Sequence, residues 1–382
     1  MRKVLIIHNK YRFRGGEDIA VENEISLLRN SYTVEEIIFE NTVTNFFSQF
    51  VSFLTNKNKK SMRLVSSYID KFNPDVVYIH NTWFKASNGI YKEIKSKNIP
   101  IVVKLHNFRF NCTKSFVSKK HVEKGVTCNA CGYISKNRIF NKYFVNSYLK
   151  SFLVNYYGKK YFKILKDSDF KILVLTVFQK EFLCNLGFDR NRIFILPNYL
   201  SAKNKQTNVN NKENNLIYAG RISKEKGVEE LITCFLKSNL IDFTLKIFGN
   251  GPDLAFLKEK YTDNRIKFFG EINNLEILEE IRKSSGVVTA TKLFEGQPTL
   301  LCEASMLGIP SVFPDTGGVS EFFPVNYNLS FKQYDYQDLT EKLNMLLLPE
   351  QTKLVGKKNK EFLNKYLEKN KLLNNFESMF IS

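Results

Sequence analysis

The chain has 382 residues, of which 43% are hydrophobic and 25% charged, and its formal net charge is +19. This length favours two domains, and the hydrophobic fraction is sufficient to build a buried core in each. No stretch approaches the roughly 18 uninterrupted apolar residues of a transmembrane helix, so the sequence excludes a membrane-spanning segment.

The positive charge is concentrated in the first half of the chain. Residues 1–200 hold 33 Lys and Arg against 15 Asp and Glu, whereas residues 201–382 hold 24 against 23. This asymmetry indicates an anionic partner for the first half, such as membrane lipid, nucleic acid or a polyphosphorylated ligand. The opening residues, MRKVLIIHNK, have too short an apolar run for a signal peptide and predict instead a first strand and a cytoplasmic protein.

Short β-branched runs alternate with longer amphipathic stretches along the chain. This alternation predicts βαβ units, and the nearly continuous apolar runs are typical of parallel strands buried on both faces. The predicted strands of the first half span residues 3–8, 34–39, 75–80, 100–106, 171–176 and 192–197. Those of the second half span residues 215–220, 243–249, 265–270, 286–290 and 309–313.

A polar, asparagine-rich segment at residues 201–215 predicts a linker. It would separate an N-terminal domain, residues 1–200, from a C-terminal domain, residues 216–365. A final helix at residues 366–382 would pack back toward the first domain. Two Rossmann-like domains of this kind would have parallel sheets facing across a cleft, with ligands beyond the carboxyl ends of the strands.

Two features of the first domain lie just beyond the carboxyl ends of predicted strands, where ligands are expected. Gly15 and Gly16 precede the first predicted helix, where the backbone can approach a phosphate closely. Three of the four histidines, His8, His80 and His106, fall at the C-terminal ends of predicted strands. A buried structural role and a role in a ligand site are both open for each of them.

Aromatic and basic residues are interleaved in residues 44–63 and again in residues 139–165. Four phenylalanines between residues 46 and 53 fall near one helical face, and lysines follow them. Aromatic residues at helical spacing usually form a core. In combination with the local positive charge, however, they predict docking at an anionic membrane surface.

Three of the six cysteines lie close together: Cys112, Cys128 and Cys131. The Cys-x2-Cys pair has the spacing of a structural zinc site, and a nearby histidine could supply a fourth ligand. The alternative is three reduced thiols in a packed loop. The other three cysteines have apolar helical contexts and are expected to be buried: Cys184, Cys234 and Cys302.

The second half of the chain carries two cations at a predicted ligand edge. The segment AGRISKEKGVEELI, residues 219–232, follows a strand and enters a helix. It places Arg221 and Lys226 in the connecting loop, and two fixed cations of this kind are suited to a diphosphate.

The segment FEGQPTLLCEASMLGIP, residues 294–310, predicts a helix from about Pro298 to Leu307. Glu295 lies before this helix and Glu303 in its second turn, so the two carboxylates are not stacked neighbours. We expect them to reach different parts of one long ligand, with a phosphate at the helix N-terminus between them. The alternative is that Glu295 only complements the helix dipole and Glu303 is solvated.

These motifs together resemble glycosyltransferase family 4. The resemblance rests on Arg221 and Lys226, on Glu295-x7-Glu303 and on the early Gly-Gly loop, and it extends over nearly the whole chain. It implies the GT-B fold, an α/β architecture of two Rossmann-like domains. It also implies a retaining, nucleotide-sugar-dependent hexosyltransferase that needs no cofactor.

The resemblance also implies roles for individual residues. Arg221 and Lys226 would hold the diphosphate of a UDP- or GDP-sugar, Glu295 would bind sugar hydroxyls, and Glu303 would accept from the ribose hydroxyls. The backbone near the sugar and the β-phosphate would belong to Gly296, Gln297, Pro298, Thr299 and Leu300.

For the first domain, the resemblance implies that Gly16 approaches the diphosphate and that His106 lies at the reaction centre. Asp167-Ser-Asp169 resembles an Asp-x-Asp metal site, but it precedes a strand and so falls at the amino edge of the sheet. We therefore predict that catalysis is independent of a divalent metal.

The expected acceptor is a glycan, lipid-linked at the inner face of the plasma membrane, in bacterial surface polysaccharide synthesis. The protein would associate with that membrane peripherally and would not bind nucleic acid. Three alternatives remain: a basic nucleic-acid-binding protein, a phosphorylase of the same fold, and an inactive GT-B scaffold.

Overall fold

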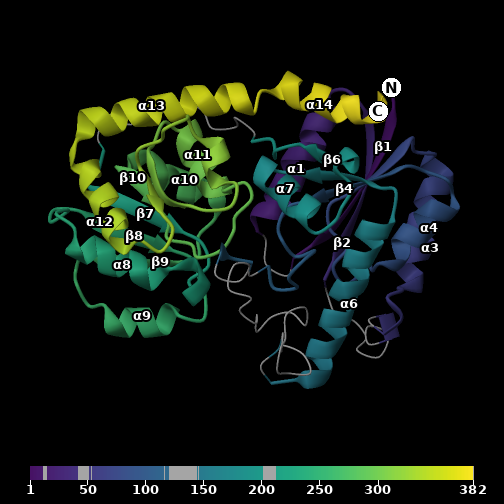
Figure 1. Ribbon diagram of the computed structural model, residues 1–382, viewed down its shortest axis with the longest axis horizontal. Helices are drawn as coiled ribbons and strands as arrows, with labels where there is room; N and C mark the ends of the chain where they lie inside the picture. Colours follow the sequence, from purple (N-terminus) through teal and green to yellow (C-terminus); the bar gives the residue numbers. More distant parts are fainter. Residues whose placement is uncertain are drawn as a thin grey trace. The chain divides into compact units, whose positions relative to one another are not determined.

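The computed structural model describes residues 1–11, 15–41, 51–52, 54–115, 117–119, 144, 146–200 and 212–381 (Figure 1). The chain divides into two compact units. The first comprises Met1–Leu200 together with Lys369–Ser382, and the second comprises Ser201–Glu368. Most of the predicted linker and the four phenylalanines of residues 46–53 lie outside the described residues.

The first unit is built on a six-stranded sheet with the order β2-β1-β3-β4-β5-β6, in which every pair is parallel. Its strands are β1 (Lys3–Lys10), β2 (Thr33–Glu40), β3 (Val76–Ile79), β4 (Ile101–Leu105), β5 (Lys171–Val174) and β6 (Ile193–Ile195). All residues of β3 and β4 are buried, which is the reason for their largely apolar pattern. The predicted doubly wound sheet is confirmed.

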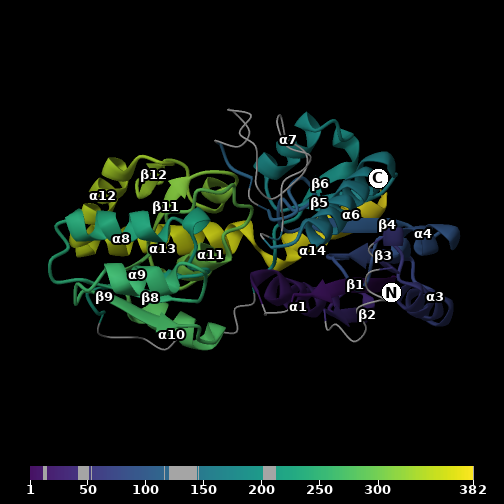
Figure 2. The same ribbon diagram turned by 90° about the horizontal axis from the view of Figure 1, so that it is seen from below.

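The described helices of the first unit connect these strands, except the last one, which lies at the end of the chain. They are α1 (Gly16–Leu28), α3 (Lys59–Phe72), α4 (Gly89–Ser96), α6 (Tyr148–Asp167), α7 (Val177–Asn185) and α14 (Lys369–Ile381), with a 3-10 turn at Arg190–Arg192. Side-chain oxygens of Asn58, Ser147 and Thr176 cap three of them by accepting from backbone amides. Figures 1 and 2 show α3 and α4 side by side.

The last helix, α14, belongs to the first unit although it lies at the end of the sequence. The ring of Phe376 packs against Tyr78 of β3 at a centroid distance of 5.2 Å and against Tyr32 at 5.5 Å. The guanidinium of Arg2 lies 5.2 Å from the ring centroid of Phe380. These aromatic contacts attach the C-terminal segment to the sheet of the first unit.

The second unit has a parallel six-stranded sheet of order β12-β11-β10-β7-β8-β9. Its strands are β7 (Asn215–Ala219), β8 (Thr244–Phe248), β9 (Ile266–Gly270), β10 (Gly286–Val288), β11 (Ser311–Asp315) and β12 (Ser330–Lys332). The sequence analysis missed β12, which is a three-residue edge strand with one buried residue.

The helices of this unit are α8 (Val228–Lys237), α9 (Leu254–Lys260), α10 (Asn274–Lys283), α11 (Thr299–Met306), α12 (Tyr336–Asn344) and α13 (Pro349–Tyr366). There are 3-10 turns at Lys224–Lys226, Val319–Phe322 and Met345–Leu347. Helix α8 packs with α12, and α11 packs with α10 and α13 (Figure 1). Because α13 continues to Tyr366, the second unit extends to Glu368, slightly beyond the predicted boundary at residue 365.

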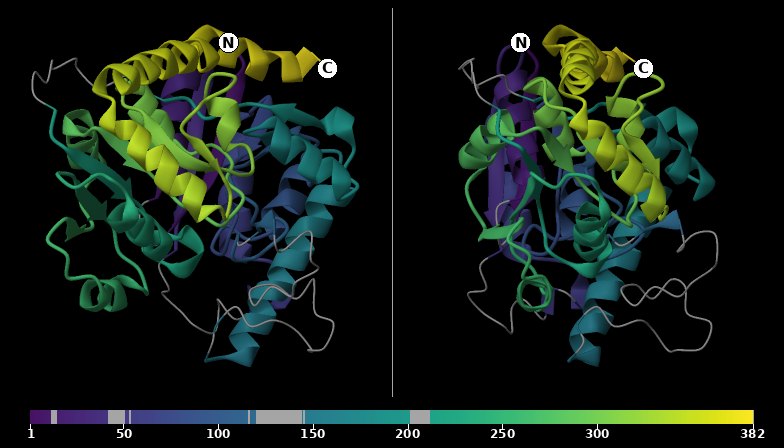
Figure 3. Two further views of the ribbon diagram at one scale, coloured as in Figure 1. Left: turned by 60° about the vertical axis from the view of Figure 1, so that its left-hand side comes forward. Right: turned by 90° about the vertical axis from the view of Figure 1, so that its left-hand side faces the viewer.

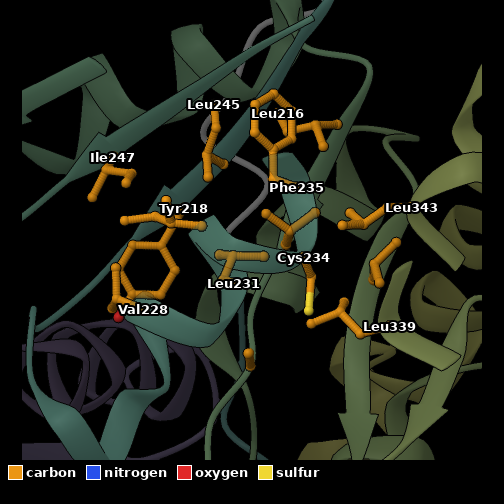
Figure 4. Close-up of a cluster of buried hydrophobic side chains, with 14 of the residues drawn as sticks. Leu216, Tyr218, Val228, Leu231, Cys234, Phe235, Leu245, Ile247, Leu339 and Leu343 are labelled. Atoms are coloured by element: carbon orange, nitrogen blue, oxygen red, sulfur yellow. The ribbon is translucent and has the colours of Figure 1, made fainter. Parts of the chain in front are cut away.

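The core of the second unit fixes α8 on its sheet. Buried side chains from β7, β8, α8 and α12 interlock there (Figure 4): Leu216, Tyr218, Val228, Leu231, Cys234, Phe235, Leu245, Ile247, Leu339 and Leu343. Close-packed apolar side chains of this kind hold an element in one position. The turn that leads into α8, which contains Lys226, is therefore held in a fixed place.

Candidate functional site

The candidate site of the second unit lies at the carboxyl edge of its sheet. The loops after β7, β10 and β11 meet there, as expected for a parallel sheet. Two glycines allow the loops to approach closely. Gly227 has a φ of +68°, and a Cβ there would lie 2.0 Å from the carbonyl oxygen of Ala290. Gly317 has a φ of +59°, and a Cβ there would lie 2.4 Å from the carbonyl oxygen of Glu295.

Lys226 and Glu295 form an ion pair at the centre of this edge. The Lys226 Nζ lies 2.5 Å from the Glu295 Oε1, and each side chain is 29% exposed. The hydroxyl of Thr291 donates to the same carboxylate oxygen at 3.0 Å. The two residues were predicted as separate ligand contacts, and the structure brings them into direct contact with each other.

Arg221 lies in the same loop as Lys226, and its side chain is exposed. The hydroxyl of Tyr218 donates to the Arg221 carbonyl oxygen at 2.8 Å and so anchors the backbone at this point. Within the part of the chain that the structure describes, the Arg221 guanidinium makes no ion pair. It is therefore available to an anionic ligand.

Glu303 lies on α11, one face of which packs against α10. Its Oε1 accepts from the Asn274 Nδ2 at 3.2 Å. Burial raises the pKa of the Glu303 carboxyl to about 7, and the bond from Asn274 opposes this rise only in part. A carboxyl group of this kind is close to half ionised at neutral pH.

Helix α11 begins at Thr299, one residue later than predicted, because Pro298 occupies the N-cap position and has a non-helical φ and ψ. The first intrahelical hydrogen bond runs from the Cys302 amide to the Pro298 carbonyl at 2.9 Å. The amides of Thr299 and Leu300 have no acceptor within the helix, which is the usual condition of a helix N-terminus. Gly296 and Gln297 precede this end of the helix in the Glu295 loop.

In the first unit, the carboxyl ends of the strands bring the three histidines together. The His80 Nδ1 lies 2.9 Å from the His106 Nε2, and the two rings stack with centroids 5.2 Å apart. The His8 ring lies 6.3 Å from that of His80. Burial lowers the pKa of both His80 and His106 well below its usual value, so both rings are neutral.

Asp18 links His8 to the glycine loop that precedes α1. Its Oδ1 lies 2.8 Å from the His8 Nε2, and its Oδ2 accepts from the Gly15 amide at 3.0 Å. Burial acts to raise the pKa of Asp18, but the bonds from His8 and Gly15 outweigh burial and lower it. Gly16 is exposed at the first position of α1.

Comparison with known proteins finds a family model that matches the second unit. Residues 201–369 match the family model described as glycosyl transferases group 1. The chain is similar over at least 99% of its length to solved structures that include the galactosyltransferase WaaB. The chain has the GT-B fold.

Two solved structures illustrate the GT-B match. Anabaena HepE in complex with UDP-glucose has a TM-score of 0.69 and 14% sequence identity, and all of each chain is covered. The lipopolysaccharide outer core galactosyltransferase WaaB, in its apo form, has a TM-score of 0.64 and 17% identity, with 99% of each chain covered. At these identities the likeness concerns the fold.

Two curated relatives match part of the chain. AmsD, an amylovoran biosynthesis glycosyltransferase of Erwinia amylovora, is 26% identical over 191 residues, which are 47% of this chain and 53% of AmsD. TuaC of Bacillus subtilis strain 168, named for teichuronic acid biosynthesis, is 30% identical over 128 residues, which are 33% of this chain and 31% of TuaC. The chain thus matches about half of AmsD and a third of TuaC.

Sequence reasoning missed a second polar cluster at the ligand edge of the first unit of this GT-B chain. The Glu17 Oε2 accepts from the Tyr11 hydroxyl and from the Asn107 Nδ2, each at 2.9 Å. The guanidinium of Arg109 lies 4.8 Å from the ring centroid of Trp83 and 5.4 Å from that of Tyr11. Burial raises the pKa of the Glu17 carboxyl.

A small cavity, of about 20 Å³, joins this cluster to the histidines. It is lined by Tyr11, Glu17, Asn107 and Arg109 together with His80 and His106. No local pattern could have revealed it, because these residues come from distant parts of the chain, and Tyr11 and Asn107 alone are 96 residues apart.

A buried ion pair lies near the histidines and was also missed. The Lys104 Nζ lies 2.7 Å from the Glu24 Oε2, and the Tyr78 hydroxyl donates to the Glu24 Oε1 at 2.7 Å. The side chains of Lys104 and Glu24 are 0% and 3% exposed. A lysine within the apolar run IVVKL was the one available signal in the sequence.

The structure describes only some of the residues that the sequence suggested as metal ligands. Cys112 is buried, and Cys128 and Cys131 lie outside the described residues. Asp169, at the amino edge of the sheet, forms a surface ion pair with Lys95 at 3.1 Å.

Of the other cysteines, Cys234 and Cys302 are buried, whereas Cys184 is partly exposed, because it faces away from the buried side of α7.

Proposed function

We propose that this protein is a retaining glycosyltransferase of family 4 that transfers a hexose from a nucleotide-diphosphate sugar to a hydroxyl group of a glycan acceptor. The observation that carries this proposal is the ion pair of Lys226 with Glu295 at the ligand edge of the second sheet. Arg221 lies in the same loop as Lys226, and Glu303 lies on the helix that follows the Glu295 loop. Cations, hydroxyl-binding carboxylates and a helix N-terminus are the groups that such a donor requires.

Each of these groups matches one part of the donor. The exposed Arg221 and the Lys226 ammonium would bind the diphosphate and stabilise the charge that develops on it as the glycosidic bond breaks. Glu295 would accept from sugar hydroxyls and Glu303 from ribose hydroxyls. The backbone amides at the start of α11 would lie near the β-phosphate.

The Lys226–Glu295 ion pair suggests how the site would respond to the donor: each residue would exchange the other for a group of the bound nucleotide sugar. Without a ligand, the two charges neutralise each other at 2.5 Å. When a diphosphate approaches, the ammonium gains a more highly charged partner and the carboxylate is released to accept from a sugar hydroxyl. Thr291, which donates to the same oxygen, would hold Glu295 in place during the exchange.

We propose that the reaction needs no divalent metal, because Arg221 and Lys226 supply the positive charge that the leaving diphosphate requires. From the first unit, His106 would contribute to the reaction centre and Gly16 to diphosphate binding. Addition of EDTA is expected to leave the transfer rate unchanged, and a complete loss that manganese restores would overturn this point.

The acceptor is proposed to be lipid-linked, in the synthesis of a bacterial surface polysaccharide. AmsD and TuaC are named for polysaccharide biosynthesis and WaaB for the lipopolysaccharide outer core. No described helix is both long and apolar enough to cross a membrane. Contact with an anionic membrane would therefore be peripheral.

Helix α6 supports this membrane contact. Its N-terminal end projects away from the sheet of the first unit (Figures 1 and 3). Tyr148, Leu149 and Phe152 are 63%, 60% and 49% exposed on this end, and Lys150 lies beside them. Exposed apolar side chains with neighbouring lysines are the combination that inserts into an anionic lipid surface.

The deciding experiment is a comparison of ligands by thermal shift. UDP, GDP and their sugars should raise the Tm, and a single-stranded oligonucleotide should not. Stabilisation by the oligonucleotide alone would favour a nucleic-acid-binding protein. A donor that stabilises the protein then enters a transfer assay with a lipid-diphosphate-linked sugar acceptor.

A further inference from the structure

The turn after the edge strand β12 reaches the loop that carries Glu295. Residues 332–335 form this turn, and the Asp335 amide closes it by donating to the Lys332 carbonyl at 2.9 Å. The Asp335 side chain then caps α12. The turn is therefore held between a strand and a helix, and the side chains of its two middle residues project from a fixed backbone.

Both middle residues of the turn donate to backbone carbonyls of the Glu295 loop. The Tyr334 hydroxyl donates to the Lys292 carbonyl at 3.0 Å, and the Gln333 Nε2 donates to the Thr291 carbonyl at 3.3 Å. Both donating side chains are half-buried. Because the two carbonyls are consecutive, these bonds fix the path of the chain just before Glu295.

Lys292 is also bound to the loop after β7. Its amide donates to the Glu225 carbonyl at 2.9 Å, and its ammonium lies 2.5 Å from the Glu230 Oε1. Glu225 immediately precedes Lys226 in the 3-10 turn that leads into α8. Lys292 therefore joins the turn of Tyr334 to the turn that holds Lys226.

Thr291 connects this backbone to the Glu295 carboxylate. The Thr291 hydroxyl donates to the Glu295 Oε1 at 3.0 Å and accepts from the Leu293 amide at 3.3 Å. The Thr291 side chain is buried and branched at Cβ, so the position of its hydroxyl follows the position of its backbone. A shift of the backbone at residues 291 and 292 would therefore move the donor that orients Glu295.

The backbone of Tyr334 has an unusual conformation. Its φ is +72°, in the left-handed region that favours glycine. A bulky side chain raises the free energy of this conformation, and such outliers cluster at functional sites. Glycine would form the same turn without this cost, but it would lack the hydroxyl that reaches Lys292.

We propose that Tyr334 is a positioning residue that holds the Glu295 loop in the geometry that the sugar of the donor requires. It acts through Lys292 and Thr291 and makes no contact with the donor itself. This inference rests on the proposed function, in which Glu295 accepts from sugar hydroxyls. Lys226 lies in a turn that the core around α8 fixes independently, so binding of the diphosphate depends less on Tyr334.

Tyr334→Phe removes the hydroxyl and keeps both the ring and the turn. In isothermal titration calorimetry, its Kd for UDP-glucose or GDP-mannose, whichever the wild type binds, should rise roughly tenfold. Its Kd for the free UDP or GDP should change less than about twofold. A nucleotide-sugar Kd that is unchanged, or a loss that is equal for the sugar-free nucleotide, would contradict the proposal.

Tyr327→Phe is the matched control for the loss of a hydroxyl. The Tyr327 hydroxyl donates to the Ser311 carbonyl at 2.7 Å, at the amino end of β11 and so at the opposite edge of the sheet. This variant should leave both Kd values at the wild-type level. A nucleotide-sugar loss as large as that in Tyr334→Phe would show that any such hydroxyl has the same effect, and it would overturn the specific role of Tyr334.

A double-mutant cycle tests whether Tyr334 acts through Glu295. Glu295→Ala alone should weaken binding of the nucleotide sugar, and the addition of Tyr334→Phe should weaken it no further. Additive losses would mean that Tyr334 acts by another route, and they would refute the proposal.

Amide hydrogen exchange of the ligand-free protein tests the same role without a donor. The peptide that contains the Lys292 amide should exchange roughly tenfold faster in Tyr334→Phe than in the wild type, and at the wild-type rate in Tyr327→Phe. Unchanged exchange in Tyr334→Phe overturns the positioning role alone. A wild type that binds neither nucleotide nor nucleotide sugar overturns the proposed function, and with it the role of Tyr334 in donor binding.

Discussion

Burial of the ionised Glu303 carboxylate lowers the stability of the folded protein, and the same carboxylate has a proposed role in donor binding. Substitution by glutamine should separate these two effects. Burial raises the pKa of Glu303 from 4.5 to about 7. Between these two values the unfolded chain has lost the proton while the folded chain retains it. The free energy of unfolding therefore decreases as the pH rises from about 4.5 to about 7 and is constant above that range.

The size of this effect follows from the pKa change. At about 1.4 kcal/mol for each pKa unit, a rise of roughly 2.5 corresponds to about 3 kcal/mol of lost stability at alkaline pH. In Glu303→Gln this loss is removed, and the amide oxygen can still accept from Asn274. The variant should be more stable than the wild type by up to about 3 kcal/mol near pH 8, a rise in Tm of roughly 6–12 °C. Near pH 4.5 the two proteins should be about equal.

The assay is thermal denaturation of both proteins across this pH range, followed by titration with UDP- and GDP-sugars. Glu271→Gln, at an exposed position in the same unit, is the matched control and should follow the wild type. Glu303→Gln should bind the donor about tenfold more weakly, because an amide replaces the carboxylate that we propose accepts from the ribose hydroxyls. The reasoning is wrong if the stability difference does not grow with pH, or if donor binding is unchanged.

Three further predictions test other parts of the structure. Gly227→Ala should lower stability by about 2 kcal/mol and impair donor binding, because its Cβ would meet the Ala290 carbonyl oxygen, whereas Gly15→Ala, whose Cβ meets nothing within 4 Å, should leave the Tm unchanged. Lys104→Met should cost about 3–5 kcal/mol in urea denaturation, because it leaves the Glu24 carboxylate buried without its cation, and adding Glu24→Gln should restore most of that loss. Phe152→Glu should weaken sedimentation with anionic vesicles, and salt should weaken wild-type binding; equal binding to neutral vesicles would contradict the electrostatic part.

The fold could be predicted because the chain follows one simple rule throughout. Parallel strands buried on both faces need continuous apolar runs, and each such run in the sequence became a strand. The exception, β12, has three residues, and its strand conformation depends on pairing with β11. Its sequence, Ser-Phe-Lys, has one apolar residue and so lacks the apolar run that identified the equally short β6 and β10.

The candidate site could be predicted in part, for a related reason. The strand-end rule brought His80 and His106 to one edge because it depends only on strand direction. The pairing of Lys226 with Glu295, 69 residues apart, could not be derived in this way. It depends on the close approach of two loops, which Gly227 and Gly317 permit and which no periodicity records.

The buried polar contacts of the first unit also join residues that are far apart in the sequence, so they could not be predicted from it. Glu17 bonds to Asn107 over 90 residues and Glu24 to Lys104 over 80. In the sequence each glutamate resembles a solvated position on an amphipathic helix. Only the packing of α1 on the sheet gives each of them a buried partner.

The most direct test of the account is the transfer reaction itself. The full chain, incubated with UDP- and GDP-hexoses and a lipid-diphosphate-linked sugar acceptor, should form a new glycosidic bond with the same anomeric configuration as the donor, as read by proton NMR. Lys226→Ala should abolish this product, and Lys224→Ala, an exposed lysine in the same turn, should not. A product of inverted configuration, or full activity without Lys226, would contradict the account.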